Sequence, residues 1–191
     1  MYKRQAEALA AEGVNLVMNA RTSSNLERTA EKIRKTYKVE VKTIACDVTT
    51  VDGQNKVFDT ISDLDILVTN AGGPPPGMWY DWEQEDFLAA LNANMLTPIS
   101  FIKAYLPGMI AQGWGRIVNI TSQSVKAPIA TLGLSNAART GLTGYVAGTA
   151  RQVASKGVTI NNLLPGVHDT DRIVSIDQSA VRAEGISMQQ V

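Results

Sequence analysis

Cysteine and histidine are almost absent from this sequence of 191 residues. Cys46 is the only cysteine and His168 the only histidine, which excludes an internal disulfide and a structural zinc site built from these residue types. Because Cys46 lies in an apolar run, we expect a small buried side chain there, with a reactive thiol as the alternative. We therefore predict that no metal is bound and that the protein resides in a reducing cytoplasm.

The sequence also lacks an excess of charge of either sign and any long hydrophobic run. Eighteen Lys and Arg balance eighteen Asp and Glu, so there is no electrostatic case for nucleic acid or an anionic membrane surface as a partner. No apolar run approaches the ~20 residues that span a bilayer. With 45% hydrophobic and 19% charged residues, the chain is expected to be globular and soluble.

Both ends of the sequence are unusual. Residues 1–5 resemble a translated sequencing adapter, and we expect them to be an artefact outside the fold. Residues 6–12 are typical of the last turns of a helix, and Gly13 stands where a glycine commonly follows one. We therefore expect residues 6–191 to form a single domain that is incomplete at both ends.

Short apolar segments alternate with helical patterns in the rest of the chain. Strands are predicted at residues 14–19, 39–48, 64–69, 116–120 and 158–164, and helices at 52–61, 83–109 and 134–155. A further helix follows the first strand, where Ser24 and Glu27 have the spacing of a capping box. This alternation predicts an α/β fold: a Rossmann-type, doubly wound parallel sheet in three α/β/α layers.

Polar or glycine-bearing residues follow each of the five predicted strands. They are Arg21, Asp47 with Val48, Asn70 to Gly72, Ser122, and Pro165 with Gly166. In doubly wound sheets ligands bind beyond the carboxyl ends of the strands. The sequence therefore predicts one binding site along this edge.

These strand-end residues resemble, in order and spacing, the motifs of the short-chain dehydrogenase/reductase family. The resemblance covers Ala6 to Arg172 and is carried by Asp47-Val48, Asn70-Ala71-Gly72, Asn94, Gly115 to Ser122, and Pro165-Gly166. Segments 70–76 and 134–139 resemble the 3-oxoacyl-(acyl-carrier-protein)-reductase-like branch with a divergent active site. The resemblance implies an oxidoreductase that transfers a hydride between a nicotinamide cofactor and a carbonyl or alcohol, for which a 3-oxoacyl thioester is one candidate.

The resemblance also implies which residues bind the cofactor. Asp47 would accept a hydrogen bond from the adenine amino group, with the Val48 amide beside it; an ordinary loop aspartate is the alternative. Arg21 follows a strand where NAD-dependent enzymes carry an acid, and an arginine can pair with a 2′-phosphate, which favours NADP(H) over NAD(H). The other implied cofactor-binding residues are Asn70, Ala71 and Gly72, which would allow close backbone approach, and Pro165, Gly166 and Thr170.

The implied catalytic residues depart from the family pattern. Ser122 matches the serine that hydrogen-bonds the substrate carbonyl, and Asn94 matches the asparagine that supports a proton relay. Ser135 and Arg139, however, stand where the family has its catalytic tyrosine and lysine. Arg139 keeps a cation for the nicotinamide ribose, but an alkyl hydroxyl is a far weaker acid than a phenol. We expect a water held between Ser122, Ser135 and Arg139 to replace the tyrosine.

Two further functions stay open, and several expectations follow from the resemblance. The first alternative is a dinucleotide-binding protein without turnover, acting as a sensor or partner subunit; the second is another doubly wound enzyme such as a methyltransferase. The family's first strand, with its glycine-rich turn, and its last strand would lie outside this sequence. Without the first strand the chain alone is expected to fold poorly, to bind no NADP(H) and to be inactive. The complete protein is expected to be a homodimer or homotetramer.

Overall fold

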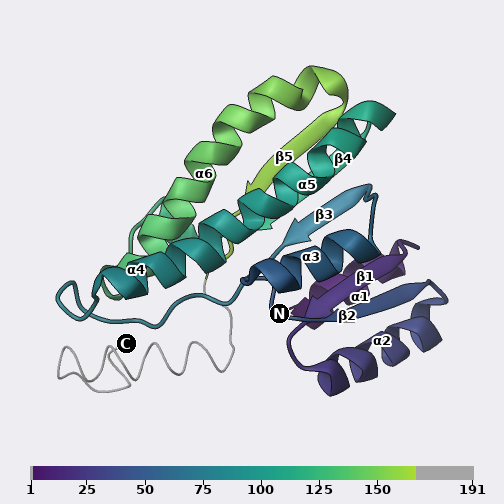
Figure 1. Ribbon diagram of the computed structural model, residues 1–191, viewed down its shortest axis with the longest axis horizontal. Coiled ribbons are helices and arrows are strands. Elements are labelled where there is room, and N and C mark those ends of the chain that lie inside the picture. Colours follow the sequence, from purple (N-terminus) through teal and green to yellow (C-terminus); the bar gives the residue numbers. More distant parts are fainter. Residues whose placement is uncertain (1, 167–191) are drawn as a thin grey trace. The chain divides into compact units, whose positions relative to one another are not determined.

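The computed structural model describes residues 2–166, which divide after Ser62 into two compact units (Figure 1). No helix among these residues has the length and apolar character needed to span a membrane.

The first unit contains two parallel strands and three helices. Its elements are α1 (Tyr2–Ala11), β1 (Leu16–Ala20), α2 (Ser23–Tyr37), β2 (Val41–Ala45) and α3 (Val51–Thr60). The strands pair in parallel, with Leu16 opposite Val41 and Ala20 opposite Ala45. Gly13 has φ +77°, which confirms that a glycine in the left-handed region follows the first helix. One buried cluster of this unit consists of Ala10, Leu16, Ala30, Ile33 and Val41.

The beginnings of α1 and α2 differ from the sequence-based expectation. Helix α1 begins at Tyr2, so residues 2–5 are helical; their adapter origin stays a prediction. Helix α2 is preceded by Thr22, whose side chain makes no cap hydrogen bond, and Ser24 lies inside its first turn. The capping box predicted at Ser24 and Glu27 is therefore wrong.

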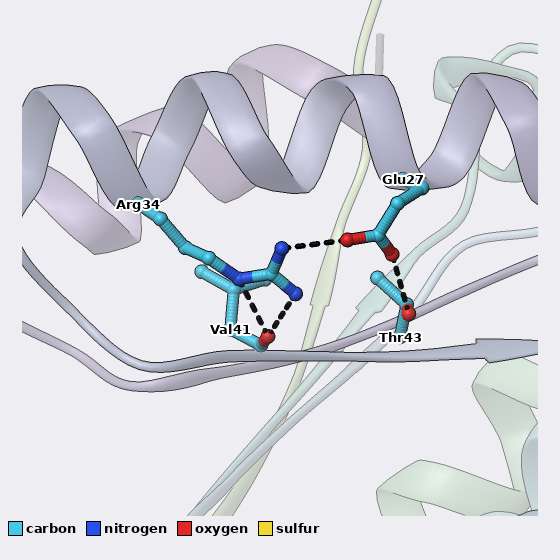
Figure 2. A network of polar contacts seen from close by, with 4 residues as sticks. All are labelled: Glu27, Arg34, Val41 and Thr43. Carbon is cyan, nitrogen blue, oxygen red and sulfur yellow. Dashed lines mark hydrogen bonds and ion pairs between the residues drawn. The ribbon is translucent and has the colours of Figure 1, made fainter.

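The reason is that the Glu27 carboxylate faces the sheet, as Figure 2 shows. It accepts hydrogen bonds from Arg34 Nη1 at 2.6 Å and from Thr43 Oγ1 at 2.8 Å. Arg34 also donates to the Val41 carbonyl, from Nε at 3.1 Å and Nη2 at 2.6 Å. These contacts lower the pKa of Glu27, mainly through the Arg34 hydrogen bond. The two side chains thus join α2 to β2.

The second unit contains a three-stranded parallel sheet in the order β3-β4-β5. Its elements are β3 (Ile66–Thr69), α4 (Gln84–Leu91), the π-helical segment η1 (Asn92–Leu96), α5 (Thr97–Gln112), β4 (Gly115–Ile120), the 3₁₀ turns η2 (Gln123–Val125) and η3 (Ala130–Leu132), α6 (Gly133–Val153), the 3₁₀ turn η4 (Ala154–Lys156) and β5 (Val158–Leu163). Helix α5 contacts β4 and α6 contacts β5, as the teal and green helices in Figure 1 show. The long helix expected at 83–109 is thus interrupted by a π-helical segment.

A polar ladder crosses this sheet in the last row that all three strands share. Thr69 Oγ1 donates to Asn119 Oδ1 at 2.7 Å, and Asn119 Nδ2 donates to Asn162 Oδ1 at 3.1 Å. The three residues are register partners on neighbouring strands, and Asn119 is 0% exposed. Because a buried amide needs its partners, the ladder fixes the register of the three strands just before they end.

The strands and helices confirm the predicted α/β fold with parallel pairing. Within residues 2–166 the strands form two separate sheets, in which β1 and β3 each have one neighbour. The strands expected outside this sequence stay a prediction, as does the grouping of all these elements into one domain.

Candidate functional site

In the first unit, Arg21 and Asp47 lie at the same edge of the sheet. Arg21 directly follows β1 and Asp47 comes shortly after β2, and the last residues of these strands are register partners. Asp47 Oδ1 accepts hydrogen bonds from Thr49 Oγ1 at 2.7 Å and Thr49 N at 3.0 Å. These bonds lower the pKa of Asp47, and the charge of Arg21 adds to the effect. The edge therefore carries an ionised carboxylate with a cation in its neighbourhood.

The main chain of Asp47 is fixed on the start of α3. Its carbonyl accepts from Thr50 Oγ1 at 2.8 Å, and the Thr50 hydroxyl in turn caps α3 by accepting from Gly53 N at 3.1 Å. A Cβ at Gly53 would lie only 1.8 Å from the Asp47 carbonyl oxygen. The Val48 carbonyl accepts from Gln54 Nε2 at 2.9 Å. Helix α3 thus sets the position of the residues predicted to face adenine.

Cys46, which precedes this loop, is half-buried rather than buried as expected. Its thiol donates to the Gly53 carbonyl at 3.3 Å and accepts from Asn19 Nδ2 at 3.1 Å. Asn19 also donates to the Ile44 carbonyl at 2.8 Å. The prediction of a purely apolar environment failed because a polar side chain on the neighbouring strand lies beside the sulfur.

In the second unit, Ser122 lies where β4 ends and beside the segment that follows β5. Thr121 donates to the Leu163 carbonyl from both N, at 2.8 Å, and Oγ1, at 3.0 Å. Gln123 N donates to the Pro165 carbonyl at 3.0 Å, so the pairing continues past the strands. Ser122 is extended (φ −159°, ψ 150°) and its Oγ accepts from Ser124 N at 3.1 Å. The backbone around Ser122 is therefore held on β5 and on its own turn.

Ser135 and Arg139 form a buried pair on α6, with exposures of 4% and 8%. Arg139 Nε donates to Ser135 Oγ at 3.1 Å. Arg139 Nη1 donates to the carbonyls of Ile120 at 2.9 Å and Thr121 at 3.0 Å. The Ala71 carbonyl lies 3.5 Å from Nη2, a long contact. The guanidinium thus reaches the ends of both β3 and β4.

Asn94 lies in the π-helical segment and is 3% exposed. Its Nδ2 donates weakly to the Ala90 carbonyl at 3.4 Å, whereas Oδ1 is buried with no hydrogen-bond partner among the described residues. Segment η1 contacts α6. A buried amide oxygen without a partner is unusual and fits a site that a water or ligand group completes.

Sequence reasoning missed Trp82, which joins the segment after the Asn70–Gly72 turn to the start of α6. A Cβ at Gly133 would lie 2.4 Å from the Trp82 ring, and one at Gly77 would lie 3.0 Å from Trp82 Nε1. Gly77 N also donates to the Thr131 carbonyl at 2.9 Å. The only sequence signal is the pair of glycines that make room for the ring. Ser124, with a wholly buried hydroxyl lacking a partner in the described part of the chain, was missed as well.

The structure therefore assembles two groups of predicted residues. Arg21, Asp47 and Val48 share an edge in the first unit. In the second unit, Arg139 contacts Ser135, Ala71 and Thr121, the residue before Ser122. Asn70 and Gly72 flank Ala71 in the chain. Pro165 and Gly166 follow β5. Asn94 lies on a segment that contacts α6. Thr170 lies outside the described residues.

Comparison with known sequences gives matches along most of the chain. Residues 3–180 match the family described as short chain dehydrogenase. The chain is 35% identical to 3-oxoacyl-(acyl-carrier-protein) reductase FabG of Vibrio harveyi, over 76% of this chain and 62% of the relative. It is 33% identical to acetoacetyl-CoA reductase of Cupriavidus necator, over 66% of this chain and 52% of the relative. The chain thus spans between about half and two thirds of the length of these two relatives.

Solved structures give the same result for the fold. A variant of actinorhodin polyketide ketoreductase with NADPH superposes with a TM-score of 0.87 at 27% identity, over 98% of this chain and 74% of that one. YwfH, an NADPH-dependent reductase involved in bacilysin biosynthesis, gives a TM-score of 0.87 at 26% identity, over 93% and 72%. Both matches confirm the Rossmann-type architecture predicted from the alternation of strands and helices.

Proposed function

The chain belongs to the short-chain dehydrogenase/reductase family, and from that premise we propose that it is an NADP(H)-dependent oxidoreductase acting on a carbonyl or alcohol substrate. The observation that carries the proposal is the environment of Ser122. Its Oγ accepts from Ser124 N, so the hydroxyl proton is available for a substrate carbonyl oxygen. A hydrogen bond donated there stabilises the negative charge that develops on this oxygen during reduction.

The residues of the first unit fit the adenosine end of NADP(H). Arg21 is exposed beyond β1 and has the planar donor set that suits a 2′-phosphate. Asp47 is an ionised acceptor that suits the adenine amino group, with the Val48 amide beside it. The cofactor, when bound, supplies the hydride. Asn70, Ala71 and Gly72, with Pro165, Gly166 and Thr170, are also proposed to bind the cofactor.

The proton that accompanies hydride transfer needs a route that does not use a phenol. Ser135 Oγ accepts from Arg139 Nε, so its own proton points elsewhere. We propose that Ser122 and Ser135 hold a water that gives a proton to the substrate oxygen and regains one from solvent, with Asn94 supporting the relay through its buried Oδ1. General acid catalysis typically contributes ~10²–10⁴-fold. Turnover slower than in tyrosine-containing relatives is therefore expected.

The names of two relatives support the substrate class that we propose. Proteins named 3-oxoacyl-(acyl-carrier-protein) reductase and acetoacetyl-CoA reductase are among the matches, which supports a 3-oxoacyl thioester as substrate. We also propose a cytoplasmic homodimer or homotetramer. The alternative function, binding of a dinucleotide without turnover, is favoured by the observation that Ser135 and Arg139 are engaged with each other and with backbone carbonyls.

The test is incubation of the full-length protein with NADPH and a panel of carbonyl compounds that includes acetoacetyl-CoA, monitored by loss of NADPH absorbance. Slow oxidation that Ser122→Ala strongly reduces, without removing it, supports the reductase. Binding of NADPH in a fluorescence titration without any oxidation supports the non-catalytic alternative. Absence of binding contradicts both functions.

A further inference from the structure

We propose that Arg139 and Ser135 are a positioning pair for Ser122, and that Arg139 does not itself hold the cofactor. The inference deepens the proposed function, on which it rests for the role of Ser122. It departs from the expectation that Arg139 contacts the nicotinamide ribose.

The Arg139 donors point at the backbone that leads to Ser122. Nη1 donates to two successive carbonyls, those of Ile120 and Thr121. The Thr121 carbonyl belongs to the peptide bond that joins Thr121 to Ser122. Because the peptide unit is planar, fixing this oxygen also fixes the nitrogen of Ser122. The guanidinium therefore restrains the backbone from which the Ser122 hydroxyl extends.

Strand β5 restrains Thr121 as well, through the donors of that residue. Its N and Oγ1 both donate to the Leu163 carbonyl. Thr121 thus has its donors bound to β5 and its acceptor bound to α6. Only the torsions of Ser122 itself remain to place its hydroxyl, and the hydrogen bond to Ser124 N restrains those.

Ser135 orients the Arg139 side chain. Arginine has a long side chain with many rotamers, and ordering it costs conformational entropy. Ser135, one turn earlier on α6, accepts from Nε and so selects the rotamer that directs Nη1 at the two carbonyls. Nε and Nη1 are then engaged, and Nη2 points toward the Ala71 carbonyl. A lysine, whose donors share one nitrogen, cannot span the same set of acceptors.

The kinetic test uses Arg139→Lys in the full-length protein, with acetoacetyl-CoA and NADPH as substrates, because Ser135 is also proposed to hold the proton-delivering water. We expect kcat/KM for acetoacetyl-CoA to fall about tenfold in this variant, with the KM for NADPH unchanged. In a Ser122→Ala background, Arg139→Lys should have less than about a twofold further effect, because both changes act on the same group. Arg151→Lys is the matched control, since Arg151 is exposed in the last turn of the same helix. The inference would be overturned if Arg139→Lys had its full effect in the Ser122→Ala background, or if Arg139→Lys raised the KM for NADPH.

Amide hydrogen exchange of the ligand-free protein provides a second readout that needs no turnover. In Arg139→Lys and in Ser135→Ala, exchange should be faster than in the unmodified protein in residues 120–125, which include the Ser124 amide bound by Ser122 Oγ. Exchange in α2 should stay unchanged. An unchanged rate in residues 120–125, or an even increase throughout residues 63–166, contradicts the positioning role. A protein that never oxidises NADPH would refute the proposed reductase, yet exchange would still decide whether the pair restrains Ser122.

Discussion

Gly53→Ala tests whether α3 fixes the predicted adenine-binding residue Asp47. Gly53 is buried in the first turn of α3, and an added Cβ would lie 1.8 Å from the Asp47 carbonyl oxygen, 2.6 Å from its carbon and 3.0 Å from Thr50 Oγ1. Side-chain carbons do not approach backbone atoms so closely. The loop and the helix must therefore separate by more than an ångström.

The expected magnitude combines three effects. Alanine in place of glycine within a helix is favourable by ~0.5–1 kcal/mol. Forcing an extra carbon into a packed site costs ~1–3 kcal/mol or more, and losing the Thr50 cap to Gly53 N costs ~1 kcal/mol. We expect a net loss of about 2 kcal/mol in the free energy of unfolding, which lowers Tm by ~4–8 °C in a protein of this size.

The assay is thermal and urea unfolding of the full-length protein followed by circular dichroism, together with NADPH titration. Gly144→Ala is the matched control, because Gly144 lies exposed in α6 and an added Cβ would meet no atom beyond its own helix in the described part of the chain. It should raise stability by ~0.5–1 kcal/mol and leave NADPH affinity unchanged. Gly53→Ala should weaken NADPH binding as well. A Gly53→Ala protein as stable as the unmodified one would refute the reasoning.

Three further predictions follow from buried or charged contacts. Asn119→Ala should lower the free energy of unfolding by ~2–4 kcal/mol in urea titrations, because it leaves the ladder partners Thr69 and Asn162 unsatisfied and opens a cavity; a loss below ~1 kcal/mol would contradict the ladder. Gly133→Ala should cost ~1–3 kcal/mol and red-shift tryptophan fluorescence as Trp82 is displaced, whereas unchanged emission would show that the ring is not held there. Thr49→Val should raise the pKa of Asp47 toward 3.8, since the Thr49 hydroxyl is the main cause of its lowering. Thr49→Val should therefore lower the free energy of unfolding at neutral pH, and this difference should disappear as the pH falls through the folded-state pKa of Asp47. A difference that does not change with pH would exclude the hydrogen bond to the Asp47 carboxylate as its cause.

Local sequence patterns were sufficient to predict the elements and the edge where polar residues gather. Apolar segments located all five described strands to within a few residues, and Gly13 marked the end of α1. The position of Arg21 and Asp47 at the same edge follows from parallel pairing alone. These features depend on interactions close in the chain or on the general geometry of parallel sheets.

Features that depend on distant partners could not be predicted. Glu27 satisfies capping-box spacing, but Arg34 and Thr43 bind its carboxylate instead. Asn119 and Asn162 lie 43 residues apart, and no local pattern indicates that they meet. The contacts of Arg139 with backbone carbonyls are invisible in a sequence, because every residue has the same carbonyl group.

The π-helical segment between α4 and α5 lets the helical surface tolerate a change in chain length. Buried residues continue through it, from Ala90 and Asn94 to Ile102, Tyr105 and Met109. Because a π-helical turn holds about one residue more than an α-helical turn, deleting one residue from Asn92–Leu96 would restore ordinary winding and keep the buried faces of α4 and α5 in phase. A deletion within α5 itself, with the α-helical winding kept, would instead rotate the residues on its two sides by about 100° relative to each other.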